Sequence, residues 1–163
     1  MGGNIQKGYS MILEKFKLAS MKSRIAAIKR IRCPVDVLVY AALEDPDWFV
    51  RHTALGLSNC PPEALAKAAL ENVSWAVRMA AVRHVNCPAD ILTAALKDED
   101  CSVRTAVVRN VNCSVELLAE ALKDEEWFVR AAAVEHVNCP VGGIAEALKD
   151  EELLVRLAAV ERI

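Results

Sequence analysis

The six cysteines of this 163-residue chain are the residues best suited to metal or redox chemistry. No Cys-x-x-Cys pair is present to ligate zinc or an iron–sulfur cluster. Stacked repeats, about 8–10 Å apart, would hold equivalent cysteines farther apart than the roughly 7 Å Cα separation of a disulfide. We therefore expect reduced, metal-free and mostly buried thiols of a cytoplasmic protein, with Cys101, outside the regular series, as the more reactive one. The regular series has intervals of 27, 27, 26 and 26 residues and comprises Cys33, Cys60, Cys87, Cys113 and Cys139.

The histidines and acidic residues also lack a catalytic or metal-binding pattern. His84 and His136 hold equivalent positions two repeats apart, and no Ser or Cys has a His/Asp pair within one repeat. No glycine-rich phosphate loop occurs. The acidic turns, such as residues 98–100, lack the Gly and the ligand alternation of a calcium-binding loop. The sequence therefore predicts a protein that is not an enzyme and that uses neither metal nor cofactor.

The cysteine spacing reveals the elements that position these residues, because a Val-Arg pair recurs in step with it. Each of the first four of these Arg residues precedes the next Cys by nine residues. Arg24 precedes Cys33 by the same nine residues, so a half repeat comes before five repeats of 26–27 residues. We expect residues 1–32 to form a basic N-terminal segment with a half-repeat cap. Residues 33–163 form the repeats, in one structural domain with that cap.

Each repeat carries the signals of two short helices. Pro follows the repeat Cys in four of five repeats and suits a first helical position. A polar turn then precedes a second helix with apolar residues at i, i+4, i+5 and i+8, as at Val77, Ala81, Val82 and Val85. Asn before the next Cys suggests a left-handed residue that ends this helix. Helices this short are unstable alone, so the sequence predicts an all-α solenoid of stacked repeats.

The motif Asp-x-x-x-x-Val-Arg-x-x-Ala-Val, as at residues 124–134, resembles the HEAT-like repeats. The short period and the Asn-Cys-Pro-x-x-x-Leu junction are more similar to the leucine-rich repeat variant family, over about residues 24–163. This resemblance implies a right-handed superhelix. It leaves open whether the first helix of each repeat has α or 3₁₀ geometry. It also implies a ladder between repeats, built from the turn Asp and the Arg six residues later. In the second repeat Asn72 replaces the acid before Arg78, so one rung would lack its charge. The other expected pairs are Asp45/Arg51, Asp98/Arg104, Asp124/Arg130 and Asp150/Arg156.

One face of the expected second helices varies from repeat to repeat, whereas the apolar face recurs closely. Positions three before, one after and five after the repeat Arg are spaced i, i+4, i+8 and share this face. All three tryptophans lie on it, and Trp and Arg are common interface anchors. Packing of each Trp on the neighbouring first turn is the alternative. Since inner helices of solenoids line a concave binding surface, we expect a partner to contact this variable stripe, which comprises Trp48, His52, Trp75, Met79, Arg83, Arg109, Trp127 and Glu135.

The charge distribution keeps other partners open. Residues 1–32 hold eight Lys or Arg and one acid, whereas the remainder carries an excess of nine acidic residues. The acidic body disfavours nucleic acid, and the basic segment leaves it as an alternative. Resemblance to the HEAT-like bilin lyases leaves a second alternative function, that of an accessory subunit of an enzyme. We predict a non-catalytic cytoplasmic scaffold for a protein or peptide partner, without membrane contact, because the longest apolar run has seven residues.

The last repeat predicts self-association. The sequence stops at Ile163, and Leu153, Leu154 and Leu157 stand where earlier repeats mix aromatic and polar residues. Solenoids usually end in a repeat with a polar outer face, so we expect an exposed apolar patch on this uncapped C-terminal repeat. A closed dimer is favoured over a head-to-tail assembly with the basic N-terminal segment.

Overall fold

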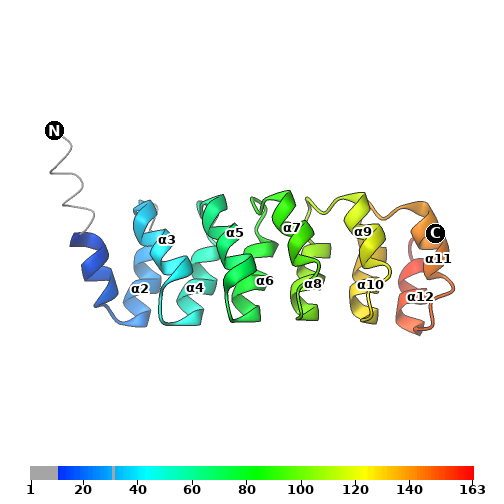
Figure 1. Ribbon diagram of the computed structural model, residues 1–163, viewed down its shortest axis with the longest axis horizontal. Coiled ribbons are helices and arrows are strands. Elements are labelled where there is room, and N and C mark those ends of the chain that lie inside the picture. Colours follow the sequence, from blue (N-terminus) through cyan, green and yellow to red (C-terminus); the bar gives the residue numbers. More distant parts are fainter. Residues whose placement is uncertain (1–10, 31) are drawn as a thin grey trace.

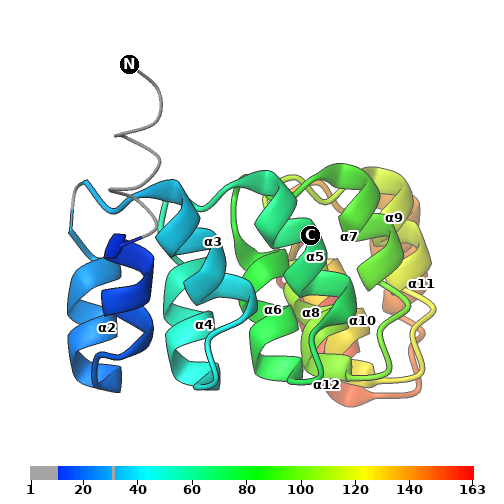
Figure 2. The same ribbon diagram turned by 60° about the vertical axis from the view of Figure 1, so that its left-hand side comes forward.

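The computed structural model describes residues 11–30 and 32–163, and all regular structure there is helical. Figures 1 and 2 show two layers of helices, in a row that runs from the N-terminal to the C-terminal repeat. One layer contains the first helices of the repeats, α3 Val35–Leu43, α5 Pro62–Glu71, α7 Ala89–Ala95, α9 Val115–Ala121 and α11 Val141–Ala147. The other contains α2 Met21–Ile28 and the second helices, α4 Trp48–Leu55, α6 Trp75–Arg83, α8 Cys101–Val108, α10 Trp127–Glu135 and α12 Leu153–Val160. The chain is therefore an α-solenoid of two-helix repeats.

Local sequence explains where most helices begin. Asp47 and Asp100 cap α4 and α8, because each carboxylate accepts a hydrogen bond from the backbone N–H two residues later. Ser114 caps α9 by accepting from the Leu117 N–H at 3.3 Å. Pro34 and Pro140 stand one residue before α3 and α11, in the extended N-cap conformation. The sequence predicts these prolines at the first helical position, but each is the N-cap residue and the helix begins one residue later. The fixed φ of proline suits this extended cap as well.

The first helices are α-helices rather than 3₁₀ turns, with lengths of 7 to 10 residues. The expected left-handed Asn at the ends of the second helices is wrong, since no described residue, glycine included, has positive φ. The chain instead turns with a hydrogen bond from the repeat Cys N–H to the carbonyl three residues earlier. At Cys87 the acceptor is the His84 carbonyl at 2.9 Å, and at Cys113 it is the Asn110 carbonyl at 2.9 Å.

The apolar core fills the space between the two layers. Its most regular members are one Leu of each first helix from α3 to α9 and one Val of each second helix from α4 to α12. Burial of each such side chain stabilises the fold by about 1.5–3 kcal/mol. Fully buried examples, with 0% exposure, are Leu38, Leu65, Leu92, Leu118, Val50, Val77, Val103 and Val129.

The N-terminal segment covers the start of this core. Residues 11–17 are helical, and Phe16 is buried. Its ring lies edge-on to Tyr40, with centroids 6.2 Å apart, and Lys17 Nζ lies 5.0 Å from the Tyr40 ring centroid. The rest of the basic N-terminal segment, residues 1–10 with Lys7, lies outside the described residues. Within the described part of the chain, no helix combines the length and apolarity needed to cross a membrane.

Candidate functional site

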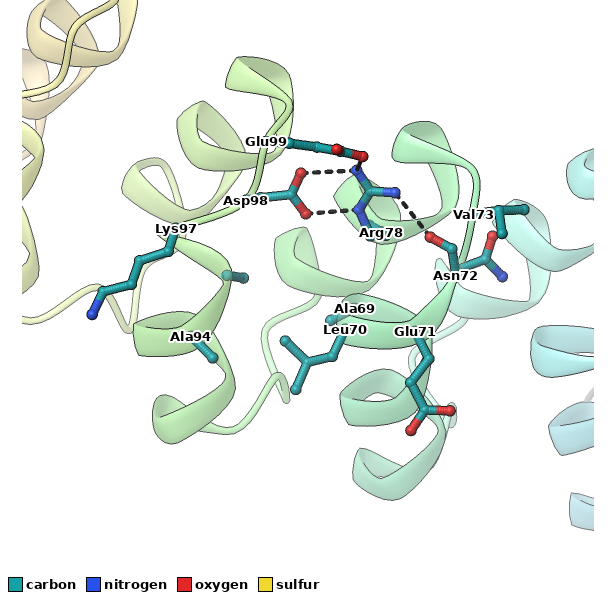
Figure 3. Close-up of a pocket in the computed structure, with 11 residues that line it drawn as sticks. Ala69, Leu70, Glu71, Asn72, Val73, Arg78, Ala94, Lys97, Asp98 and Glu99 are labelled. Atoms are coloured by element: carbon teal, nitrogen blue, oxygen red, sulfur yellow. Dashed lines mark hydrogen bonds and ion pairs between the residues drawn. The ribbon is translucent and has the colours of Figure 1, made fainter.

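The repeat arginines form a hydrogen-bonded ladder that joins successive turns. Arg78 donates from Nε and Nη2 to the two carboxylate oxygens of Asp98, at 2.7 and 2.8 Å, and from Nη1 to the Asn72 carbonyl at 2.9 Å. Figure 3 shows this rung beside a cavity of about 590 Å³ between α5 and α7. Each arginine thus bonds the backbone of its own turn and the carboxylate of the next. Equivalent bidentate pairs are Arg24–Asp45, Arg104–Asp124 and Arg130–Asp150.

The ladder is interrupted at one internal junction. Arg51 donates from Nη1 to the Asp45 carbonyl at 2.6 Å, but its buried Nε has no partner among the described residues. The acid of the next turn is replaced by Asn72, whose Oδ1 accepts from the Ser74 N–H at 3.0 Å. The Asp98 carboxylate makes the same local bond at 2.8 Å, so the two turns have matching geometry. In the last repeat, Arg156 bonds the backbone carbonyls of residues 150 and 151.

Opposite charges stabilise each other along the ladder. The hydrogen bond from Arg130 lowers the pKa of Asp150 below its ordinary value. Conversely, hydrogen bonds to their aspartates raise the pKa of Arg78, Arg104 and Arg130. The guanidinium groups therefore stay charged in their pairs with these aspartates.

A second set of bonds between repeats, absent from the sequence-based expectations, joins the other ends of the second helices. His84 Nε2 lies 3.0 Å from the Leu57 carbonyl, and Asn110 Nδ2 donates to the Val82 and His84 carbonyls at 2.6 and 3.1 Å. Arg162 reaches the carbonyls of residues 135 and 137, at 3.3 Å each. These side chains bond carbonyls at the C-terminal ends of second helices, where helical N–H partners run out; the Leu57 and His84 carbonyls also accept from the Cys60 and Cys87 N–H groups. His84, Asn110 and Arg162 each lie six residues after the repeat Arg, and this recurrence of polar residues was the available signal.

The variable stripe lies on the second-helix layer. Trp48, Trp75 and Trp127 are 50%, 47% and 37% exposed, so packing covers about half of each ring. Trp48 lies edge-on to its neighbour Phe49 with centroids 5.7 Å apart, and Trp127 packs in the same way on Phe128. Trp48 and Trp127 thus pack on their neighbours, and all three tryptophans leave apolar surface in solvent. His52 and Met79 are half-buried, and Arg83, Arg109 and Glu135 are exposed.

A groove of about 240 Å³ lies on this layer between α6 and α8. Arg83 and Arg109 line it, together with Met79, Ser102, Thr105 and Ala106. Arg109 Nη2 is 3.8 Å from a Glu135 carboxylate oxygen, with both side chains more than half exposed. An exposed pair at this distance contributes little stability, so Arg109 remains available to a ligand.

The repeat cysteines are packing residues. Cys60, Cys87, Cys113 and Cys139 are buried, whereas Cys33 and Cys101 are partly exposed. Burial raises the pKa of the Cys60, Cys87 and Cys113 thiols to about 11. These thiols are poor nucleophiles and poor metal ligands at neutral pH. In the described residues, no group of three or more His, Cys, Asp or Glu is placed to hold a metal ion.

Both ends of the solenoid carry further surface features. At the N-terminal end, Lys15, Arg30 and Arg32 surround a cavity of about 450 Å³ whose lining includes Ile12 and Phe16. At the C-terminal end, apolar side chains of α12 and the residue that ends the sequence are about half exposed or more. These are Leu153, Leu154, Leu157, Val160 and Ile163.

The stacked two-helix repeats and their arginine ladder define an α-helical repeat protein of the solenoid class. A solved structure described as a leucine-rich repeat variant with a novel repetitive structural motif is similar to this chain, with 26% identity and a TM-score of 0.63. The match covers 83% of this chain and 58% of that one, so this chain spans just over half the length of its neighbour. The resemblance seen in the sequence is thus confirmed for the fold.

A second solved structure, that of YibA from Escherichia coli, shares the fold at 17% identity and a TM-score of 0.63. That match covers 93% of this chain and 72% of YibA. No protein-family model and no curated protein sequence matches the chain.

Proposed function

We propose that this protein is a non-catalytic scaffold that binds a protein or peptide partner along its second-helix layer. The observation that carries the proposal is the alignment of three half-exposed tryptophans, Trp48, Trp75 and Trp127, on a layer whose other faces pack into the core. Large aromatic side chains left in solvent are typical anchors of interfaces. The adjacent groove between α6 and α8 adds two exposed cations to this surface.

The packing of the two layers supports the choice of surface. Successive second helices pack against each other more extensively than successive first helices do, most clearly α6 on α8 and α10 on α12. The more closely packed layer of a curved stack lies on its inner side, where repeat proteins bind extended partners. The bonds at both ends of these helices would fix the spacing of the anchors, which lowers the ordering cost of binding.

Selection of short random peptides displayed on phage, with the full chain as bait, tests this proposal. We expect the selected peptides to lose affinity for Trp75→Ala and Trp127→Ala, by about 1–4 kcal/mol for each anchor that is a hot spot. Val115→Ala and Val141→Ala are matched controls, because they remove exposed apolar groups from the first-helix layer. Thermal unfolding of every variant establishes that it is folded. Peptides that bind the tryptophan variants normally, or that depend on the valines, would contradict the proposal.

The basic cavity at Lys15, Arg30 and Arg32 is the feature that favours the second candidate, a nucleic acid partner. Binding there would weaken steeply with salt, because each neutralised phosphate releases counterions. A labelled single-stranded oligonucleotide titrated at two salt concentrations tests it. Binding that Lys15→Gln with Arg30→Gln abolishes would support this candidate, and no binding at low salt would exclude it.

A further inference from the structure

The groove between α6 and α8 differs in charge from the rest of the variable stripe. Arg83 and Arg109 hold equivalent positions in consecutive repeats, five residues after the ladder arginine. Both line the groove, one from the last turn of α6 and the other from the C-cap of α8. The equivalent residue of the preceding repeat is Gly56, and that of the following repeat is Glu135. Two adjacent cations therefore meet at this junction of the stripe.

The groove walls suit a small anionic group. Ala106 is buried and Met79 half-buried, so small and flexible side chains leave a hollow between the two arginines. Thr105 Oγ1 donates to the Cys101 carbonyl at 2.8 Å, which leaves Ser102 as the hydroxyl free to donate into the groove among its described lining residues. Guanidinium groups have only donors, and carboxylates have only acceptors, so the two match in paired hydrogen bonds.

The surrounding charges favour one negative charge over two. The two arginines contribute two positive charges, and Glu135, 3.8 Å from Arg109, offsets one of them. The two arginines and Glu135 therefore carry a net charge of +1. A single carboxylate matches this charge, whereas a dianionic phosphate would exceed it and would be repelled by Glu135.

We propose that this groove binds an aspartate or glutamate side chain of an extended partner peptide, held by Arg83 and Arg109. The proposal rests on the proposed function, and it specifies the chemistry of the partner. Met79 lines the groove, and the half-exposed Trp75 lies on the same face of α6, eight residues before Arg83. The partner therefore carries an apolar residue next to its acid.

The peptides selected on the full chain are the probes for this inference. We expect them to share an Asp or Glu beside an apolar residue, and replacement of that acid by its amide to weaken binding at least tenfold. Arg83→Gln and Arg109→Gln should each weaken binding of the acidic peptide about tenfold and leave the amide peptide unaffected. Lys67→Gln, which removes an exposed cation from α5 on the other layer, is the matched control.

Glu135→Gln gives a readout that a merely structural role would not produce. It removes the acid that competes for Arg109, so it should tighten binding of the acidic peptide several-fold. Selected peptides that lack acids, or that bind equally as amides, would overturn the carboxylate site, while tryptophan dependence would still uphold the binding surface. A phosphoserine peptide that binds more tightly than its glutamate counterpart, or displacement by an oligonucleotide, would also overturn it.

Discussion

Asn72→Asp should complete the interrupted ladder and stabilise the protein. The substitution is nearly isosteric, and the new carboxylate can keep the bond from the Ser74 N–H that Asn72 accepts now. Its oxygens would face Arg51, whose buried Nε is unpaired in the described structure. At the next junction the same arrangement gives bonds of 2.7 and 2.8 Å between Arg78 and Asp98.

The size of the gain follows from two favourable effects and one unfavourable effect. Leaving a buried donor unsatisfied costs about 1–3 kcal/mol, and a hydrogen bond between charged groups contributes about 1.5–3 kcal/mol. Removing the new carboxylate from water opposes both effects. We expect a net gain of about 1–2 kcal/mol in the free energy of unfolding. For a chain of this size, that corresponds to an increase in Tm of about 2–8 °C.

Urea and thermal unfolding at neutral pH measure this gain. The converse variant, Asp98→Asn, places the Asn72 arrangement at an intact junction and should lower stability by about 1–3 kcal/mol. Arg51→Gln should abolish the benefit of Asn72→Asp, because the gain depends on the pair. If Asn72→Asp leaves stability unchanged while Asp98→Asn lowers it, the explanation of the interrupted rung is wrong.

Three further predictions concern acid, thiols and the second set of bonds. Because Arg130 lowers the pKa of Asp150, this pair stabilises the fold above the ordinary aspartate pKa and loses its effect as pH falls below about 4. Asp150→Asn should therefore flatten the decline of Tm in acid and lower Tm at pH 7. At pH 8, iodoacetamide should modify Cys101 first. A pKa of about 11 leaves only about one thiolate in a thousand at each of the three most buried thiols, Cys60, Cys87 and Cys113. Equal labelling of all six cysteines would contradict this prediction. His84→Leu should lower the free energy of unfolding, measured in urea, by about 1–3 kcal/mol. His84→Asn should lower it by less, since Asn110 makes equivalent bonds in the next repeat. Equal losses for the two variants would contradict the role of these bonds.

The repeat architecture could be predicted because its signals are local and occur many times. The Cys and Val-Arg spacings define the unit, and Asp47, Asp100 and Ser114 cap helices through neighbours in the sequence. The expected left-handed Asn failed because other hydrogen bonds are made at these positions. Asn112 Nδ2 donates to the Val85 carbonyl of the preceding repeat at 2.6 Å. The backbone N–H groups of Asn86 and Asn138 instead donate to Nδ1 of His84 and His136.

The features that could not be predicted depend on distances between repeats. The sequence places Arg78 six residues after Asn72, but only the stack shows that its carboxylate partner is Asp98 in the following turn. The groove between α6 and α8 likewise needs the spacing of two helices, in addition to the types of its residues. The second set of bonds was missed because its members, His84 and Asn110 among them, differ in type at one repeat position.

Mapping of amide chemical shifts on the isotopically labelled full chain, with a selected peptide added, tests the binding surface most directly. The proposal predicts shifts along α4, α6, α8 and α10, largest near Trp75, Arg83 and Arg109. Amides of α3, α5, α7 and α9 on the first-helix layer should change little. Shifts confined to the first-helix layer, or to the basic end near Lys15 and Arg30, would contradict it.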